Sequence, residues 1–181
     1  LHKDEGVREE TTKEILSQLK PAFKPDGVIT AGNSSQISDG VAALLLVSED
    51  ILNKFNLEPI AKIRSMAVVG TDPVLMLSGP IPATRKALDQ AKLKPEDINL
   101  AEINEAFSSV VGAWRKEFPE INYENVNANG GSIAIGHPLG ATGARLMTNL
   151  IHEMKRNKLK YGLQAICEGG GTANATIVEL V

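Results

Sequence analysis

Three polar side chains stand next to turns or glycine-rich loops, where catalytic groups are commonly placed. Asn104 follows a predicted strand and opens the turn Asn104-Glu105-Ala106-Phe107. In open α/β sheets, ligands gather at the carboxyl ends of strands, so an asparagine there could fix a water molecule or donate its amide to an oxyanion. The alternative is that Asn104 caps the helix that follows, a task that asparagine performs well.

His137 lies in a loop with five glycines among residues 130–143. Glycines allow tight turns and close approach of the backbone to a ligand. A histidine held rigidly before a helix is a plausible general base near neutral pH. The loop could instead hold a structural histidine or cradle a phosphate. Its glycine spacing differs from the dinucleotide fingerprint, and it lacks the Lys-Ser/Thr of a P-loop.

Cys167, the only cysteine, ends a predicted strand and precedes Glu168-Gly169-Gly170-Gly171. Backbone N–H groups of such glycines are free to point at a ligand and to form an oxyanion hole. The alternative is that Cys167 is a small buried apolar residue, which is the usual environment of a lone cysteine.

Alternating strand and helix patterns from Ile60 onward must position these groups. The order βαβαβαββ predicts an α/β fold, with a mostly parallel five-stranded sheet and helices on both faces. The predicted strands are residues 60–69, 98–103, 126–128, 163–167 and 174–181, and the predicted helices are residues 82–91, the stretch after Asn104, and residues 141–157. The last two strands form an antiparallel hairpin.

Before Ile60 the chain predicts a helix over residues 11–19, a short strand or extended stretch over residues 28–32, and a buried strand over residues 42–47. Ser48 is expected to cap a short helix that runs through Phe55. Phe107, Val110, Val111, Trp114 and Phe118 share one face of the helix after Asn104.

Composition excludes several classes of protein. The 181 residues carry 19 basic and 22 acidic side chains, and the net charge of −3 argues against a nucleic-acid binder driven by charge. The longest apolar run, Val41–Val47, is too short to span a bilayer. One cysteine and three dispersed histidines predict neither a disulfide framework nor a metal centre. We expect a soluble, cytoplasmic domain.

Taken together, the motifs resemble the thiolase family. They are the Asn-Glu-Ala-Phe turn, the Gly-His-Pro loop and the Cys-x-Gly-Gly-Gly hairpin, together with Thr30-Ala31-Gly32-Asn33-Ser34-Ser35, Asp39-Gly40, Val69-Gly70-Thr71-Asp72-Pro73 and Gly79-Pro80-Ile81-Pro82-Ala83. The resemblance implies acyl-CoA C-acyltransferase chemistry, with coenzyme A and acyl-CoA as substrates and no tightly bound cofactor. It covers essentially the whole chain.

The resemblance also implies a role for individual residues. His137 would activate the nucleophilic cysteine and help to bind a thioester oxygen, Asn104 would hold a water in the same oxyanion hole, and Cys167 would act as acid and base. The N–H of Gly169 would serve a second oxyanion hole. A further set would line the route of coenzyme A: Ser35, Ala31, Ala106 and Phe107 along the pantetheine channel, and Phe23 nearer the nucleotide.

The family's nucleophilic cysteine has no counterpart here. By resemblance, residues 1–27 are the end of a CoA-binding loop region, residues 28–58 the last strand and helix of the N-terminal domain, and residues 59–181 the C-terminal domain. We therefore expect activity only with the N-terminal half, from the same gene or a separate chain, and assembly into homodimers or homotetramers. The alternatives are a thiolase-like protein that binds acyl-CoA or lipid without catalysis, and an assembly module.

Overall fold

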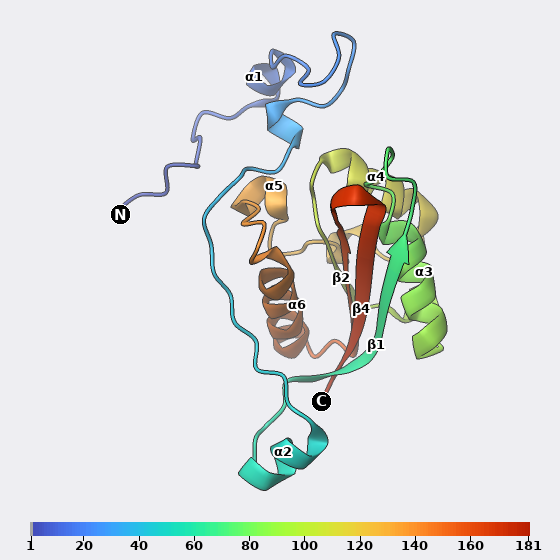
Figure 1. Cartoon of the computed structure of the whole chain (residues 1–181). Coiled ribbons are helices and arrows are strands. Elements are labelled where there is room, and N and C mark those ends of the chain that lie inside the picture. The colour runs from blue at the N-terminus through green and yellow to red at the C-terminus, as the bar shows by residue number, and fades with distance from the viewer. Residues whose placement is uncertain (1) are drawn as a thin grey trace.

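A four-stranded sheet forms the centre of the molecule, whose computed structural model describes residues 2–181 (Figure 1). The strand order is β1-β4-β3-β2, with β1 at Ala61–Gly70, β2 at Leu100–Ile103, β3 at Tyr161–Cys167 and β4 at Thr172–Leu180. Only β2 and β3 run parallel, while β4 pairs antiparallel with both β1 and β3. The expected mostly parallel, five-stranded sheet is therefore wrong in strand number and direction.

The expected fifth strand, residues 126–128, makes a single bridge between Val126 and Ala101. Asn127 then adopts a positive φ of 52°, which turns the chain away from the sheet. Its side chain takes over the role of a neighbouring strand, because Oδ1 accepts a hydrogen bond from the Ile103 N–H at 2.8 Å and Nδ2 donates to the Ile103 carbonyl at 2.9 Å.

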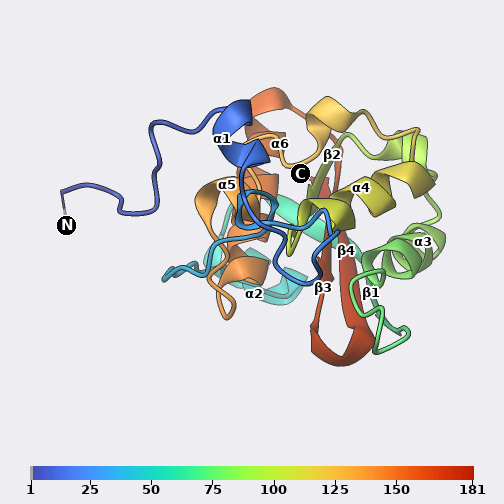
Figure 2. The same ribbon diagram turned by 90° about the horizontal axis from the view of Figure 1, so that it is seen from above.

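Helices cover both faces of the sheet, as the sequence predicted (Figures 1 and 2). Helix α3 (Pro80–Ala91) packs on one face, beside α4 (Ser108–Glu117), and α6 (Thr142–Asn157) packs on the other. The short helix α5 (Ser132–Ile135) precedes α6. The described connections contain four single-turn 3₁₀ helices: Ala31–Asn33, Pro95–Asp97, Tyr123–Asn125 and Gly169–Gly171.

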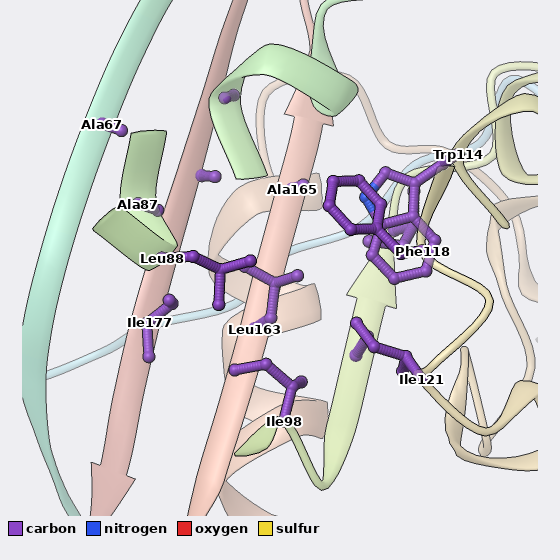
Figure 3. Packing of buried hydrophobic residues seen from close by; sticks show 14 of the residues in the cluster. Ala67, Ala87, Leu88, Ile98, Trp114, Phe118, Ile121, Leu163, Ala165 and Ile177 are labelled. Atoms are coloured by element: carbon purple, nitrogen blue, oxygen red, sulfur yellow. The ribbon is translucent and has the colours of Figure 1, made fainter. Parts of the chain in front are cut away.

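The larger core lies between the sheet, α3 and α4 (Figure 3). The expected apolar face of α4 is confirmed for Val110, Val111 and Trp114, which are buried, as is Phe118 at the C-cap. It is wrong for Phe107, which is the half-buried N-cap residue with extended backbone. The Trp114 indole N–H donates to the Thr84 hydroxyl of α3 at 3.0 Å, so the polar tip of this buried side chain is paired.

Residues before β1 lie alongside the sheet rather than within it (Figure 1). They hold α1 (Lys13–Ser17) and α2 (Glu49–Phe55). The expected Ser48 cap is confirmed, because its hydroxyl accepts from the Ile51 N–H at 3.4 Å.

Of the two early segments, residues 28–32 form no strand, with extended backbone at Thr30, and the buried strand expected over residues 42–47 is wrong. Residues 28–32 lead into a 3₁₀ turn that the Thr30 side chain caps by accepting from the Gly32 N–H. Residues 42–47 form no strand in the described chain, and Leu45 is 82% exposed. Burial of a strand requires a partner, and among residues 2–181 no strand lies beside this run.

Candidate active site

Asn104 and Cys167 meet at one edge of the sheet, where the parallel strands β2 and β3 end. Ile103 pairs with Ala165 at this edge, and the Asn104 N–H donates to the Ala165 carbonyl at 3.0 Å. Cys167 is the last residue of β3 and is 8% exposed, while Asn104 is 1% exposed. The site therefore lies where the parallel pair presents its carboxyl ends.

His137 reaches the same place from the loop between α5 and α6. It follows the short helix α5 and precedes α6, in the glycine-containing loop that the sequence indicated. Its backbone N–H donates to the Gln36 carbonyl at 2.7 Å and to the Ser38 hydroxyl at 3.0 Å. These contacts anchor the His137 loop to the segment before β1.

The side chain of Asn104 connects His137 with Cys167. Asn104 Nδ2 lies 3.4 Å from His137 Nε2, and Asn104 is near enough to Cys167 to lower the pKa of its thiol. On the other side of the ring, His137 Nδ1 lies 2.6 Å from the Thr142 hydroxyl. The three polar residues singled out in the sequence are thus linked in one site.

Burial shifts the two titratable groups of this site in opposite directions. Burial lowers the pKa of His137, and the positive charge of Arg145 lowers it further. Burial raises the pKa of the Cys167 thiol, the backbone of Cys167 and the Asn104 side chain oppose this shift, and the charge of Glu168 adds to it. At neutral pH the arrangement favours a neutral imidazole, which can accept a proton, and a protonated thiol, which can donate one.

Gly169 lies in the turn that follows Cys167, and this turn is held from outside by Thr71. The Thr71 N–H and hydroxyl both donate to the Gly171 carbonyl, at 2.7 and 2.9 Å. Gly171 has a φ of +85°, and a Cβ on it would lie 2.6 Å from the Thr71 carbonyl oxygen, so only glycine fits here. Thr71 belongs to a motif that the sequence left without a role.

Two family models match the chain, and together they cover almost all of it. The thiolase C-terminal domain matches residues 57–180, and the thiolase N-terminal domain matches residues 1–50. The chain belongs to the thiolase family. The resemblance inferred from its motifs is therefore confirmed.

Individual thiolases are similar to the chain over nearly its full length. The steroid 3-ketoacyl-CoA thiolase FadA6 of Mycobacterium tuberculosis is 52% identical over 97% of this chain, and the 3-ketoacyl-CoA thiolase of Bacillus subtilis is 50% identical over 98%. The acetyl-CoA acetyltransferase structure from Bacillus anthracis superposes with a TM-score of 0.94 at 45% identity, over 99% of this chain. Human mitochondrial 3-ketoacyl-CoA thiolase in complex with CoA gives 0.90 at 42% identity, over 98%.

The chain spans less than half the length of these thiolases. It covers 42% of the Mycobacterium protein, 45% of the Bacillus subtilis protein and 45% of each of the two solved chains. The activity of a whole thiolase is therefore a proposal for this chain.

Four of the five residues expected along the thiolase CoA channel lie together. The Ser35 N–H donates to the Ala106 carbonyl at 3.1 Å, and the Ser35 hydroxyl lies 3.3 Å from the same oxygen. The rings of Phe23 and Phe107 meet edge to face, with centroids 5.5 Å apart. Ala31 is exposed in the neighbouring 3₁₀ turn.

Two hollows flank this group of residues without containing His137 or Cys167. One, of about 460 Å³, lies beside the histidine loop and is lined by residues that include Pro138 and Ala144. The other, of about 570 Å³, lies beside α1 and includes Thr30 and Asn33. Among residues 2–181, no group of three or more His, Cys, Asp or Glu side chains is placed to hold a metal ion. Nor does that part of the chain contain a helix long and apolar enough to cross a membrane.

Sequence reasoning missed a second set of polar residues that shape the site. The Glu105 carboxylate accepts from the Ile133 N–H and from Asn127 Nδ2, both at 3.0 Å. It lies against Gly131, where any Cβ would overlap it. Glu105 was quoted within its motif, but neither spacing nor residue type reveals which loop its side chain holds.

Proposed function

We propose that this chain supplies part of the active site of an acyl-CoA C-acyltransferase. The reaction is CoA-dependent cleavage of a 3-ketoacyl-CoA, the Claisen condensation of acetyl-CoA, or both. The observation that carries the proposal is the position of the buried Asn104 amide, which lies 3.4 Å from the His137 ring at the strand ends where Cys167 also lies. A protein that only binds acyl-CoA would not require these three groups at one site.

His137 acts as the base that activates a nucleophilic thiol located outside these 181 residues. A free cysteine has a pKa of about 8.5, so only a few per cent is thiolate at pH 7. A neutral imidazole beside the thiol removes its proton, and the lowered pKa of His137 keeps the ring neutral. General acid–base help of this kind contributes roughly 10²–10⁴ in rate.

Cys167 acts as the second acid and base, at the α-carbon of the substrate or at the sulfur of CoA. Its raised pKa suits a group that delivers a proton and takes it back during the catalytic cycle. Asn104 and the N–H of Gly169 stabilise the charge that develops on the thioester oxygens.

Coenzyme A is the substrate that these residues would bind. We place its pantetheine arm along Ser35, Ala31, Ala106 and Phe107, and its nucleotide nearer Phe23. The contacts between the Phe23 and Phe107 rings, and between Ser35 and Ala106, support one continuous channel wall. The solved human relative in complex with CoA makes this substrate class plausible.

Activity requires the rest of a thiolase, which we propose as the main partner, along with assembly into dimers or tetramers. The exposed apolar run supports this need for a covering layer, since Val41 is 94% and Leu45 82% exposed. A cytoplasmic location remains a prediction, which fractionation of the source cells would test.

The test uses the thiolase completed by its N-terminal half and the variant Cys167→Ala. We expect the variant to accept labelled acyl groups on the partner's nucleophile while losing overall turnover, because acylation requires His137 and the later proton step requires Cys167. His137→Ala is the matched variant and should fail to acylate. A Cys167→Ala variant that neither acylates nor turns over would refute this division of roles.

A further inference from the structure

A buried series of hydrogen bonds leads from α6 to the ring of His137. Arg145 Nη2 donates to Ser132 Oγ at 3.1 Å, and Ser132 Oγ donates to Asn104 Oδ1 at 2.8 Å. Asn104 Nδ2 then lies 3.4 Å from His137 Nε2. Ser132 is 0% and Asn104 1% exposed, so water does not compete for these groups.

Arg145 determines which group donates and which accepts in each hydrogen bond of this series. A guanidinium group has no acceptor atom, so Ser132 Oγ accepts from Arg145 and its own proton is free for Asn104. The carbonyl oxygen of Asn104 can only accept, and it therefore faces Ser132. The amide group at the opposite end, which can only donate, faces His137 Nε2.

We infer that Arg145 and Ser132 are positioning residues that lock the Asn104 amide and so hold neutral His137 with its proton on Nδ1 and its lone pair on Nε2. The contacts on the other side of the ring support the same tautomer, because Nδ1 lies 2.6 Å from Thr142 Oγ1. The Thr142 hydroxyl donates its hydrogen bond to the Pro138 carbonyl at 2.9 Å, so its oxygen can accept from a protonated Nδ1. Hydrogen bonds at one ring nitrogen set the protonation of the other.

The positive charge of Arg145 also favours a neutral His137 ring, because it lowers the pKa of His137. Arg145 is the cation whose charge reaches His137, and its neighbours are the Glu105 carboxylate and Glu102, whose raised pKa of about 8 keeps it protonated at pH 6. The inference concerns the protonation of one ring, so it stands or falls independently of the reaction proposed above.

The first measurement needs no variant. In the chain labelled with ¹⁵N-histidine, we expect the neutral His137 ring to show a protonated nitrogen at Nδ1 and a bare one at Nε2. The opposite assignment would overturn the inference whether or not any variant folds.

The second measurement follows modification by diethyl pyrocarbonate, which attacks the bare nitrogen of a neutral imidazole. Mass spectrometry reads the rate at His137 as a function of pH, and exposed His152 on α6 serves as the internal control. In Ser132→Ala the Asn104 amide is free to rotate and to present its oxygen to His137 Nε2. This stabilises the imidazolium of His137 and, in the neutral ring, moves the lone pair to the covered Nδ1. We expect modification of His137 at pH 6 to slow by about tenfold, equivalent to one unit of pKa.

Two further variants serve as controls for the Ser132→Ala measurement. Asn104→Asp places an acceptor beside Nε2 regardless of the hydrogen bond from Ser132, so it should also slow the modification of His137. Arg145→Lys keeps a charged group that can only donate and should preserve the wild-type profile. A Ser132→Ala profile that matches wild type, while Asn104→Asp shifts it, would refute the positioning role.

Discussion

Glu102 provides the sharpest prediction about stability. It lies on β2 and is 0% exposed, and among residues 2–181 neither of its carboxyl oxygens has a hydrogen-bond partner. Burial raises its pKa from 4.5 to about 8; the charge of Arg145 opposes the shift, whereas Glu105 and Glu153 add to it. At pH 7 the folded protein therefore holds Glu102 as a neutral acid, whereas the unfolded chain ionises it.

The folded state binds the extra proton between these two pKa values, so the free energy of unfolding falls as pH rises from about 4.5 to about 8. Between these two pKa values, each unit of pH lowers the free energy of unfolding by about 1.36 kcal/mol. The stabilisation from protonated Glu102 is therefore fully present below pH 4.5, and about 3 kcal/mol of it is lost by pH 7 and about 5 kcal/mol by pH 8 and above. Glu102→Gln imitates the neutral acid and removes this dependence. We expect the variant to be more stable than wild type at pH 7 by up to about 3 kcal/mol, and equal to it near pH 4.5.

Urea unfolding at low protein concentration measures this directly. Trp114 is the only tryptophan and is 1% exposed, so its fluorescence reports loss of the core. Glu120→Gln, at an exposed position, is the control and should follow the wild-type curve at every pH. If the free energies of unfolding of Glu102→Gln and wild type changed in parallel between pH 5 and 8, the reasoning would be refuted.

Two smaller changes test the core and the glycine loop. Thr84→Val leaves the buried Trp114 N–H without a partner and should cost about 1–3 kcal/mol of unfolding free energy, a cost that nearly vanishes in a Trp114→Phe background followed by circular dichroism. Gly131→Ala forces a methyl group onto the Glu105 carboxylate and should cost about 1–3 kcal/mol in urea unfolding. Gly112→Ala, on the exposed face of α4 with open space around it, is the matched control and should instead stabilise by about 0.5–1 kcal/mol. Equal effects of the two glycine changes would contradict the crowding at Gly131.

Local signals in the sequence predicted local structure well. The Ser48 cap, the apolar face of α4 and the hairpin after Cys167 depend on residues within a few positions of one another. Strand pairing depends on distant residues, and there the predictions failed. The side chain of Asn127 replaces the expected fifth strand, and the run at residues 42–47 meets no strand in the described chain.

The same distinction applies to the site. Asn104 and Cys167 could be singled out because Asn104 follows a predicted strand and Cys167 ends another, and these two strands pair in parallel. The roles of Ser132 and Arg145 could not be predicted, because their hydrogen bonds join three separate elements and leave no spacing in the sequence. Their residue types, a hydroxyl and a cation beside the histidine loop, are the only signal that was present.

The most direct test of the proposed active site is a crystal structure of the completed thiolase with CoA bound. The account predicts that the CoA sulfur contacts Cys167 or His137 within about 4 Å, with Asn104 on the same wall and the pantetheine arm along Ser35 and Phe107. A CoA molecule whose sulfur lies away from all three polar residues would contradict the account.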